Sequence, residues 1–421
     1  MLSSFRRHRL ALHEFENKPK IKRLTRLAVV ADQGFVSVTN LILALVMVRH
    51  YPPADYASYA LALFLALAVA GAYRVALAVP VSLWTPAHFA ERRRAASSLH
   101  LAAVSTTLVL SATATIIVTL SHPEPFWHRT SAIIIALVVN YMCLDIDRAM
   151  VMRRFGTLSS TVMSFMSSIV VLMVAAGVLL LHLKIEISAL IIGLSALLKT
   201  LIIHGSSAKD FDRSDISVWR SIGGTSMSWG MAGNIASSMY MTAPQWLLGT
   251  QGDVRQIAGF AAVRTPLQPL MLLLRSFDIF DKLSFGERSA HDGDIARAHQ
   301  LRLTLFYLGA SAAFALAAAV FARPIIDIVL GPTYEEFANT LRLSALSFCL
   351  IAVAAPLETL LFSRGRHKTY AWAQFAGAAL CAAVIVPLVT NLRAEGAVLA
   401  GMIGWIPPYV ILVLNMARRQ S

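Results

Sequence analysis

Charged residues are scarce in this sequence. Asp, Glu, Lys and Arg make up 14% of its 421 residues, and hydrophobic residues make up 57%. An ordinary soluble domain carries about 25% charged residues, so the composition excludes that class of protein. Apolar runs recur along the whole chain, and each is as long as the roughly 20 residues that a membrane-spanning helix needs. We therefore expect an all-α polytopic membrane protein, because helices satisfy the polar backbone inside a bilayer.

Motifs for cofactors and catalysis are also missing. The three cysteines, Cys143, Cys349 and Cys381, lie in apolar runs and form no CxxC or Cys/His cluster, which is typical of small buried side chains. The sequence has no P-loop and no GxGxxG motif, and its His, Cys and carboxylate residues show no metal-ligand spacing. Every predicted loop is too short for an extramembrane catalytic domain. We expect no metal, no cofactor, no ATP hydrolysis and no enzymatic activity.

The apolar runs divide into twelve expected spans. Their approximate bounds are 27–48, 57–80, 98–120, 130–151, 158–182, 187–204, 222–248, 256–281, 301–321, 342–362, 369–390 and 396–416. A basic segment precedes the first span and no small-residue cleavage site follows it, so we expect no cleaved signal peptide. The longest external loop, 322–340, is expected to form a short amphipathic helix that breaks at Gly331 and Pro332, with Tyr334 at the depth of the membrane interface.

Positive charge is spread unevenly over the loops. The formal net charge is +14, and most of the 37 lysines and arginines lie in the N-terminal segment and in every second loop. Short loops that are rich in Lys and Arg face the cytoplasm. Both termini are therefore expected to be cytoplasmic. Topology accounts for the positive charge, and we expect no binding of nucleic acid.

A weak internal repeat relates the first six spans to the last six. "YASYA" (56–60) opens the second span, "IAGFA" (257–261) opens the eighth, and the same offset carries Arg74 onto Arg275. With the matching topology, this favours two parallel six-helix lobes around a central cavity. The expected parts are a cytoplasmic basic N-terminus (1–26), an N-terminal lobe (27–204), a cytoplasmic linker (205–221) and a C-terminal lobe (222–417).

Four stretches, taken in their order along the chain, carry a family resemblance. They are "ADQGFVSVTNLILALVMVRHYPPADYASYALA" (31–62), "VLGPTYEEFANTLRLSAL" (329–346), "LLFSRGRHKTYAWAQFAGAALCAAVIVPLV" (360–389) and "GAVLAGMIGWIPPYVIL" (396–412). In this order the chain resembles the polysaccharide (O-antigen and exopolysaccharide) flippases. These belong to the MATE-like multidrug/oligosaccharidyl-lipid/polysaccharide exporter superfamily. The resemblance covers nearly the whole chain.

The resemblance implies a flippase that moves undecaprenyl-pyrophosphate-linked oligosaccharide repeat units across the bacterial inner membrane by alternating access. It implies a function in exopolysaccharide or O-antigen biosynthesis. The expected partners are the polyprenyl-pyrophosphate-linked glycan, the lipid bilayer and the polysaccharide polymerase or export machinery, with the flippase working as a monomer. Two departures concern the first and seventh spans. The first contains only Asp32 and Gln33 where a basic residue is usual, and the seventh has Gln245 where many relatives have a charged residue.

Arg264 is the strongest candidate for contacting the substrate. It lies about 12 Å into its span by helical rise, which is too deep for easy snorkelling. Pro266 and Pro269 follow it and predict a kink that frees backbone carbonyls. Freed carbonyls at membrane depth are tolerated beside protein or a wet cavity, and a guanidinium fork suits a pyrophosphate. The alternative is a structural arginine that is satisfied by those carbonyls or by a neighbouring helix.

Other polar residues give weaker binding candidates. Arg74 falls, by resemblance, where relatives line their cavity with basic residues, although a long side chain near a helix end can also snorkel. Arg275 has Asp278 three residues on, which favours a local ion pair. Asn234, in a stretch of small residues, either bonds sugar hydroxyls or simply belongs to a closely packed helix face.

Acidic residues in the spans are candidates for gating or coupling. Asp32 and Gln33 are expected at the mouth of the cavity. Glu358 follows a proline deep in its span, and a carboxylate inside the membrane is a candidate for binding a proton or cation. Lys199, in contrast, is expected to snorkel to the cytoplasmic edge. Asp147 is expected in a hydrated cytoplasmic helix end.

Two other functions compete with the flippase. A MATE-like cation or drug exporter needs acidic and often aromatic pockets, whereas acidic residues are few in these spans and are accompanied by arginines. A membrane glycosyltransferase or polymerase needs a long loop with catalytic carboxylates or a phosphate–metal motif, and the sequence contains neither.

Overall fold

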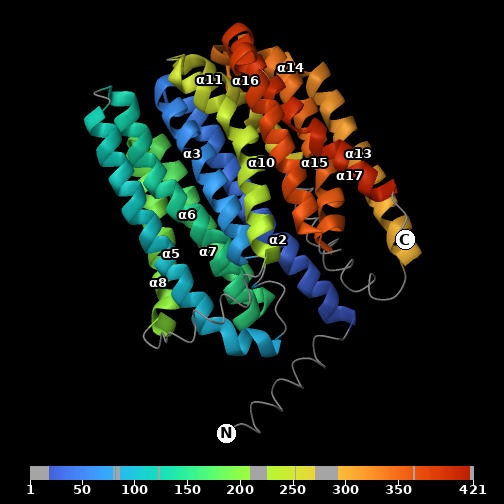
Figure 1. Ribbon diagram of the computed structural model, residues 1–421. Helices are drawn as coiled ribbons and strands as arrows, with labels where there is room; N and C mark the ends of the chain where they lie inside the picture. Colours follow the sequence, from blue (N-terminus) through green and yellow to red (C-terminus); the bar gives the residue numbers. More distant parts are fainter. Residues whose placement is uncertain are drawn as a thin grey trace.

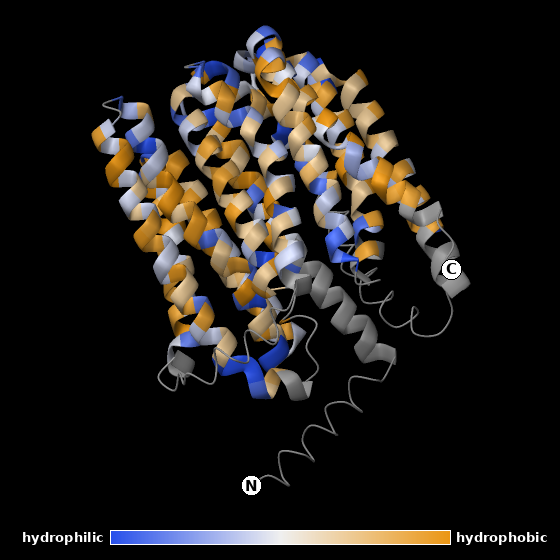
Figure 2. Ribbon diagram, in the orientation of Figure 1, coloured by the Kyte–Doolittle hydropathy of each residue, from blue (hydrophilic) through white to orange (hydrophobic). Residues whose placement is uncertain are grey.

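The computed structural model describes the residues 19–78, 81, 86–121, 124–208, 225–251, 253–270, 293–363 and 366–417. These residues form helices that run side by side in one bundle, and no strand occurs among them (Figure 1). Hydrophilic residues gather mainly at the two ends of the bundle, and hydrophobic residues dominate its middle (Figure 2). This distribution is typical of helices that cross a bilayer.

Six helices and one π-helix build the N-terminal lobe. They are α2 (Pro19–His50), α3 (Pro53–Tyr73), the π-helix η1 (Arg74–Ala78), α5 (Pro86–Ser121), α6 (Pro125–Phe155), α7 (Thr157–Leu181) and α8 (Ile185–Ala208). Several of these helices begin with proline, whose fixed φ suits the first helical position and whose missing N–H costs nothing there. Gly156 separates α6 from α7 with a φ of 88°, a conformation that glycine adopts without strain.

The C-terminal lobe is more interrupted. Its long helices are α10 (Thr225–Thr250), α11 (Val254–Arg264), α13 (Gly293–Val320), α15 (Ala338–Ser363), α16 (His367–Gly404) and α17 (Ile406–Ala417). Its short elements are the 3₁₀-helix η2 (Thr265–Leu267), α14 (Ala322–Ile325), the π-helix η3 (Ile326–Leu330) and the 3₁₀-helix η4 (Pro332–Phe337). The long α16 is broken at Arg393, where φ is 50°, so it supplies the eleventh expected span and the start of the twelfth.

The predicted fold class is confirmed. Eight segments of the described chain are long and apolar enough to cross a membrane, and one of them, His367–Leu414, covers both of the last two expected spans. The helices are therefore consistent with about twelve spans in a multi-pass membrane protein. Most of the expected linker, 209–221, lies outside the described residues, so the lobe boundaries stay a prediction.

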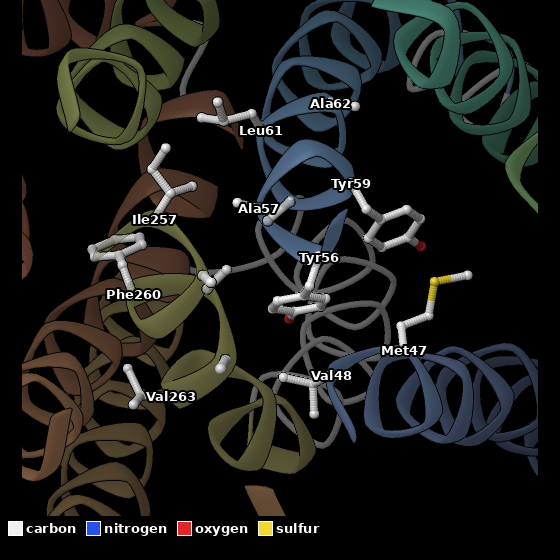
Figure 3. Packing of buried hydrophobic residues seen from close by; sticks show 14 of the residues in the cluster. Met47, Val48, Tyr56, Ala57, Tyr59, Leu61, Ala62, Ile257, Phe260 and Val263 are labelled. Atoms are coloured by element: carbon white, nitrogen blue, oxygen red, sulfur yellow. The ribbon is translucent and has the colours of Figure 1, made fainter. Parts of the chain in front are cut away.

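Apolar side chains of α3 pack against those of α11 where both helices start. Figure 3 shows this contact, and one hydrophobic core runs through both lobes here. A Cβ atom added to Gly249 of α10 would lie 3.1 Å from Leu61 Cδ1 of α3, so α10 joins the contact. By the predicted topology this end is external. We call the packing of these side chains the external closure: Tyr56, Ala57 and Leu61 of α3 with Ile257, Phe260 and Val263 of α11.

The external loop 322–340 is helical apart from one break. The break falls at Gly331, as predicted, with a φ of 91° that favours glycine. Tyr334 was expected at the depth of the membrane interface, and that depth stays a prediction. The side chain is 2% exposed and its ring centroid lies 6.4 Å from that of Phe337. Phe337 in turn fills the space beside Gly259, so this segment supports the external closure.

Candidate functional site

Arg264 is the last residue of α11. It lies ten residues after Val254, about 15 Å along a regular helix, which is roughly half of the ~30 Å hydrocarbon thickness. The chain then changes to the 3₁₀-helix η2. Pro266 explains this change, because it lacks the N–H that a regular α-helix would need. The predicted distortion after Arg264 is confirmed.

Three aromatic rings surround the Arg264 guanidinium. Its Cζ atom lies 5.2 Å from the ring centroid of Phe348, 5.3 Å from that of Phe260 and 5.7 Å from that of Phe64. At these distances the ring faces attract a cation. Phe64 belongs to α3, so the rings come from both lobes. Within the part of the chain that the structure describes, Arg264 has no carboxylate partner.

A small cavity of about 20 Å³ adjoins Arg264, which is room for about one water molecule. Gln245 lines it and is 2% exposed. The amide nitrogen of Gln245 donates a 2.7 Å hydrogen bond to the Met241 carbonyl, whereas its Oε1 atom has no partner. The Oγ atom of Ser344, another lining residue, also has none. Buried polar atoms are costly when unpaired, so this cavity is suited to a polar ligand.

The structure does not bring the predicted arginines together. Arg74 lies ten residues beyond Phe64 on the same helix path, about 15 Å along it, whereas Phe64 touches Arg264. Arg74 is exposed, and its Nε lies 3.6 Å from a carboxylate oxygen of Asp145. Arg275 lies outside the described residues. Arg264 is thus the one predicted arginine that the structure places within a ring of aromatic side chains.

Asn234 lies where the two lobes meet. A Cβ atom added to Gly71 of α3 would be 2.9 Å from Asn234 Oδ1, so this α10 side chain faces the N-terminal lobe. The same oxygen is buried without a hydrogen-bond partner. Gln245 is eleven residues further along α10, about 16 Å by helical rise, so Asn234 does not share the Arg264 cavity.

The predicted gate and coupling residues lie in different lobes. Asp32 of α2 is 4% exposed and forms an ion pair with Arg148 of α6. The side chain of Gln33 lies outside the described residues. Glu358 of α15 accepts a 3.1 Å hydrogen bond from Gln374 Nε2, and Gln374 Oε1 accepts a 2.6 Å bond from the Tyr240 hydroxyl.

A polar cluster inside the N-terminal lobe was missed by the sequence analysis. Asp147 was expected at a hydrated helix end, and that is wrong, because it is 0% exposed. It contacts His100 of α5, His204 of α8 and Lys199, whose Nζ atom lies 3.5 Å away. Lys199 therefore turns towards a carboxylate rather than only to the membrane edge. The signal available in the sequence was two histidines within apolar runs.

Comparison with solved structures decides the fold. The lipid II flippase MurJ in an inward closed conformation superposes with a TM-score of 0.72 at 12% identity, over 93% of this chain and 87% of that chain. An inward-facing multidrug resistance MATE family transporter of the MOP superfamily gives a TM-score of 0.67 at 12% identity, over 94% of this chain and 98% of that one. The chain has the fold of the MOP superfamily transporters. No protein-family model and no curated protein sequence matches it.

A transporter with the same fold has also been solved in an outward-facing conformation. An outward-facing multidrug resistance MATE family transporter matches with a TM-score of 0.57 at 12% identity, over 93% of each chain. The two inward conformations thus score higher than this outward-facing one. In this chain, apolar side chains of α3 and α11 pack together at the predicted external end.

Proposed function

We propose that this protein is a flippase for undecaprenyl-pyrophosphate-linked oligosaccharide repeat units in the bacterial inner membrane. It would supply exopolysaccharide or O-antigen biosynthesis and carry out no chemical reaction on its cargo. The fold supports a transporter. The observation that carries the choice of cargo is Arg264, a guanidinium at mid-membrane depth with aromatic neighbours and no carboxylate partner among the described residues.

An anionic ligand would give this arginine a counter-charge. A charged side chain at the bilayer centre costs at least about 2.5–3.5 kcal/mol, and the aromatic rings offset only part of that cost. A phosphate group would accept charge-assisted, bidentate hydrogen bonds from the guanidinium. Gln245 and Ser344 supply further polar atoms in the adjoining cavity. The positive charge of the site favours a phosphate group over a cationic drug, and the cavity of about 20 Å³ would widen to admit a pyrophosphate head group.

The external closure agrees with loading from the cytoplasmic side. With α3 and α11 packed together at the external end, cargo would reach Arg264 from the other side. The lipid tail would remain in the bilayer while the lobes rock to expose the head group outward. Arg74, Arg275 and Asn234 are the further residues that we propose along this path, with Arg74 released from Asp145 as the phosphate arrives.

Arg264→Gln tests the proposal directly. One charge-assisted hydrogen bond is worth about 1.5–3 kcal/mol, so we expect flipping of lipid-linked repeat units to fall by about 10- to 100-fold. The measurement is the accumulation of repeat units on the cytoplasmic side in cells that carry the variant as their sole copy. Arg323→Gln is the matched control, because Arg323 is an exposed arginine in the external segment. Normal export by a well-folded Arg264→Gln variant would contradict the proposal.

A MATE-like cation or drug exporter is the second candidate. The observation that favours it is the carboxylate of Glu358, which is linked through Gln374 to Tyr240, whose ring packs at 5.4 Å from that of Trp405. This is the acidic and aromatic setting that such exporters need. Drug resistance on overexpression that Glu358→Gln abolishes and Arg264→Gln leaves intact would favour the exporter over the flippase.

A further inference from the structure

Three helices of the N-terminal lobe bring three potential metal ligands together in its interior. His100 of α5, Asp147 of α6 and His204 of α8 have side chains that are 0% exposed. His204 Nε2 lies 3.1 Å from Asp147 Oδ1, and His100 Nε2 lies 3.5 Å from the same oxygen. One ligand atom from each residue lies within 4.8 Å of the other two.

The outer nitrogen of each histidine is already held. Tyr73 Oη lies 2.6 Å from His100 Nδ1, and Ser97 Oγ lies 3.0 Å from His204 Nδ1. These bonds fix both rings with Nε2 turned towards Asp147. His100 Nε2 is nevertheless buried without a hydrogen-bond partner. With its proton on Nε2, His100 faces Asp147 Oδ1 only at the 3.5 Å limit of a hydrogen bond, and a weakly paired buried polar group is costly.

We propose that His100, Asp147 and His204 bind a divalent transition-metal ion of the zinc class. Zinc bonds to imidazole nitrogen and carboxylate oxygen measure about 2.0–2.2 Å, so the edges of a tetrahedral site are about 3.3–3.6 Å. The two separations from Asp147 Oδ1, 3.1 and 3.5 Å, are close to these values, whereas the limit for the whole set is 4.8 Å, so the two histidine nitrogens would draw together on binding. Imidazole with carboxylate favours zinc over magnesium or calcium. The hydrogen bonds to the outer nitrogens are those that orient histidine ligands of a metal.

When no metal is bound, the ammonium group of Lys199 balances the negative charge of Asp147. Its Nζ atom lies 3.5 Å from Asp147 Oδ2, the oxygen that faces away from the histidine contacts, and its side chain is 18% exposed. Lys199 also lines an apolar groove of about 450 Å³ between α6, α7 and α8. A bound ion would repel the ammonium outward along this groove, since a long side chain can carry its charge to the edge of the membrane. Lys199 and the metal therefore compete for the charge of Asp147.

The ion would tie α5, α6 and α8 into one rigid unit. Asp147 also accepts a 2.8 Å hydrogen bond from Thr200, which keeps its carboxylate oriented. The proposal does not rest on the identity of the cargo, because every ligand and partner lies within the N-terminal lobe. A bound ion stabilises the folded state in proportion to the logarithm of its concentration.

Zinc alone is the probe for this site. The full-length protein, purified in detergent with a histidine-free tag, is dialysed against buffered zinc, and its metal content is measured. We expect about one tightly bound zinc per chain, as for a single tetrahedral site, with a higher unfolding temperature than in chelator. Asp147→Asn is expected to lose both effects, because it removes the anionic ligand. Magnesium is expected to produce neither effect.

A second histidine pair provides the matched control. His50 Nε2 lies 3.2 Å from His182 Nδ1 at the external surface, where metal could bind adventitiously. The His50→Ala/His182→Ala variant is expected to keep the tight zinc. If this double variant loses the tight zinc, or if the parent protein binds no zinc, the buried cluster is not a metal site and the proposal is wrong.

Two further variants change the affinity in opposite directions while leaving the three ligands in place. Tyr73→Phe removes the bond that orients His100, and we expect about 10- to 100-fold weaker zinc binding. Lys199→Met removes the competing charge, and we expect binding to be tighter by about tenfold or more. Both variants should elute as the parent does on size exclusion. Unchanged affinity in both would overturn the assignment even if Asp147→Asn fails to fold.

Discussion

Ionisable side chains within the membrane are stabilised in three different ways in this protein. Asp32 has a single basic partner in Arg148. Asp147 has several partners, namely two histidines, a lysine and a threonine. Arg264 has aromatic rings but no carboxylate among the described residues. The first two arrangements complete the charge within the protein, and the third does not do so among the described residues. This contrast is the residue-scale reason to place the substrate head group at Arg264.

The pair of Asp32 and Arg148 gives a prediction about stability. Their side chains are 6% and 14% exposed, so Asp32→Asn would leave a buried arginine without its counter-charge. Loss of one partner of such a pair costs about 3–5 kcal/mol. We expect the thermal unfolding midpoint of Asp32→Asn in detergent to fall clearly below that of the parent protein.

The double variant Asp32→Asn/Arg148→Gln separates stability from gating. It replaces both charges by amides, so we expect it to recover most of the lost stability. If it also recovers transport, the pair is structural. If it folds but does not transport, Asp32 acts as the gate residue that we predicted. A single variant as stable as the parent would show that the ion pair contributes little.

At the scale of elements, interrupted helices lie beside the proposed site and the external closure. The path of α3 continues as a π-helix from Arg74, and α11 changes to a 3₁₀-helix after Arg264. The π-helix η3 ends at Gly331, beside the external closure. Such irregular turns leave backbone groups unpaired, and the protein satisfies the carbonyls of η3 with a side chain from the other lobe.

Arg49 is that side chain, and it gives a prediction about conformation. Its Nε donates a 2.8 Å hydrogen bond to the Val329 carbonyl, and its terminal nitrogen bonds the Ile328 carbonyl. These bonds cross from α2 to η3, and we expect them to break when the external end opens. Because Arg49 is exposed, we assign them about 1 kcal/mol, a factor of about five in population. Arg49→Ala is expected to raise the outward-open fraction by that factor.

Accessibility of a cysteine placed in the external closure measures this shift. Ala57→Cys lies in the packed contact (Figure 3), so a membrane-impermeant thiol reagent should label it faster when Arg49→Ala is added. Arg342→Ala is the control, since Arg342 bonds Asn339 and the Ala319 carbonyl within its own lobe. Equal labelling in all three backgrounds would mean that Arg49 does not hold the closure.

At the scale of the whole molecule, helix α3 makes extensive contacts between the lobes. Helix α3 of the N-terminal lobe packs against both α10 and α11 of the C-terminal lobe. Two small residues permit this approach: Gly249 adjoins Leu61, and Gly71 adjoins Asn234. Alternating access by rocking lobes requires the external part of this interface to separate. The arrangement with a packed external closure would then be one end of that cycle.

A disulfide across the closure tests alternating access. The side chains at positions 61 and 249 face each other, since a Cβ atom at Gly249 would lie 3.1 Å from Leu61 Cδ1. We expect Leu61→Cys/Gly249→Cys to cross-link on mild oxidation whenever the two Cβ atoms approach to about 4 Å. The oxidised protein should lose transport, and reduction should restore it. The three native cysteines are buried, so they should not interfere. Full transport by the oxidised double variant would contradict a cycle that opens at this end.

Much of the architecture could be predicted from the sequence because it follows from local composition. Apolar run length predicted the spans, Gly331 and Pro332 predicted the external break, and Pro266 predicted the distortion after Arg264. Each of these effects is decided within one or two helical turns. The family resemblance extended these predictions to a transporter fold, which the structural comparisons support.

The partners of polar residues could not be predicted in the same way. His204 is 57 residues from Asp147, and Ser97 is 107 residues from His204. No periodicity in the sequence links such distant residues. Asp147 was therefore predicted at a hydrated helix end, and the ion pair between Arg74 and Asp145 was not predicted. The sequence by itself determined the spans and the distortion at Arg264. Only the tertiary structure decided which charges meet, because burial and pairing depend on how separate helices pack.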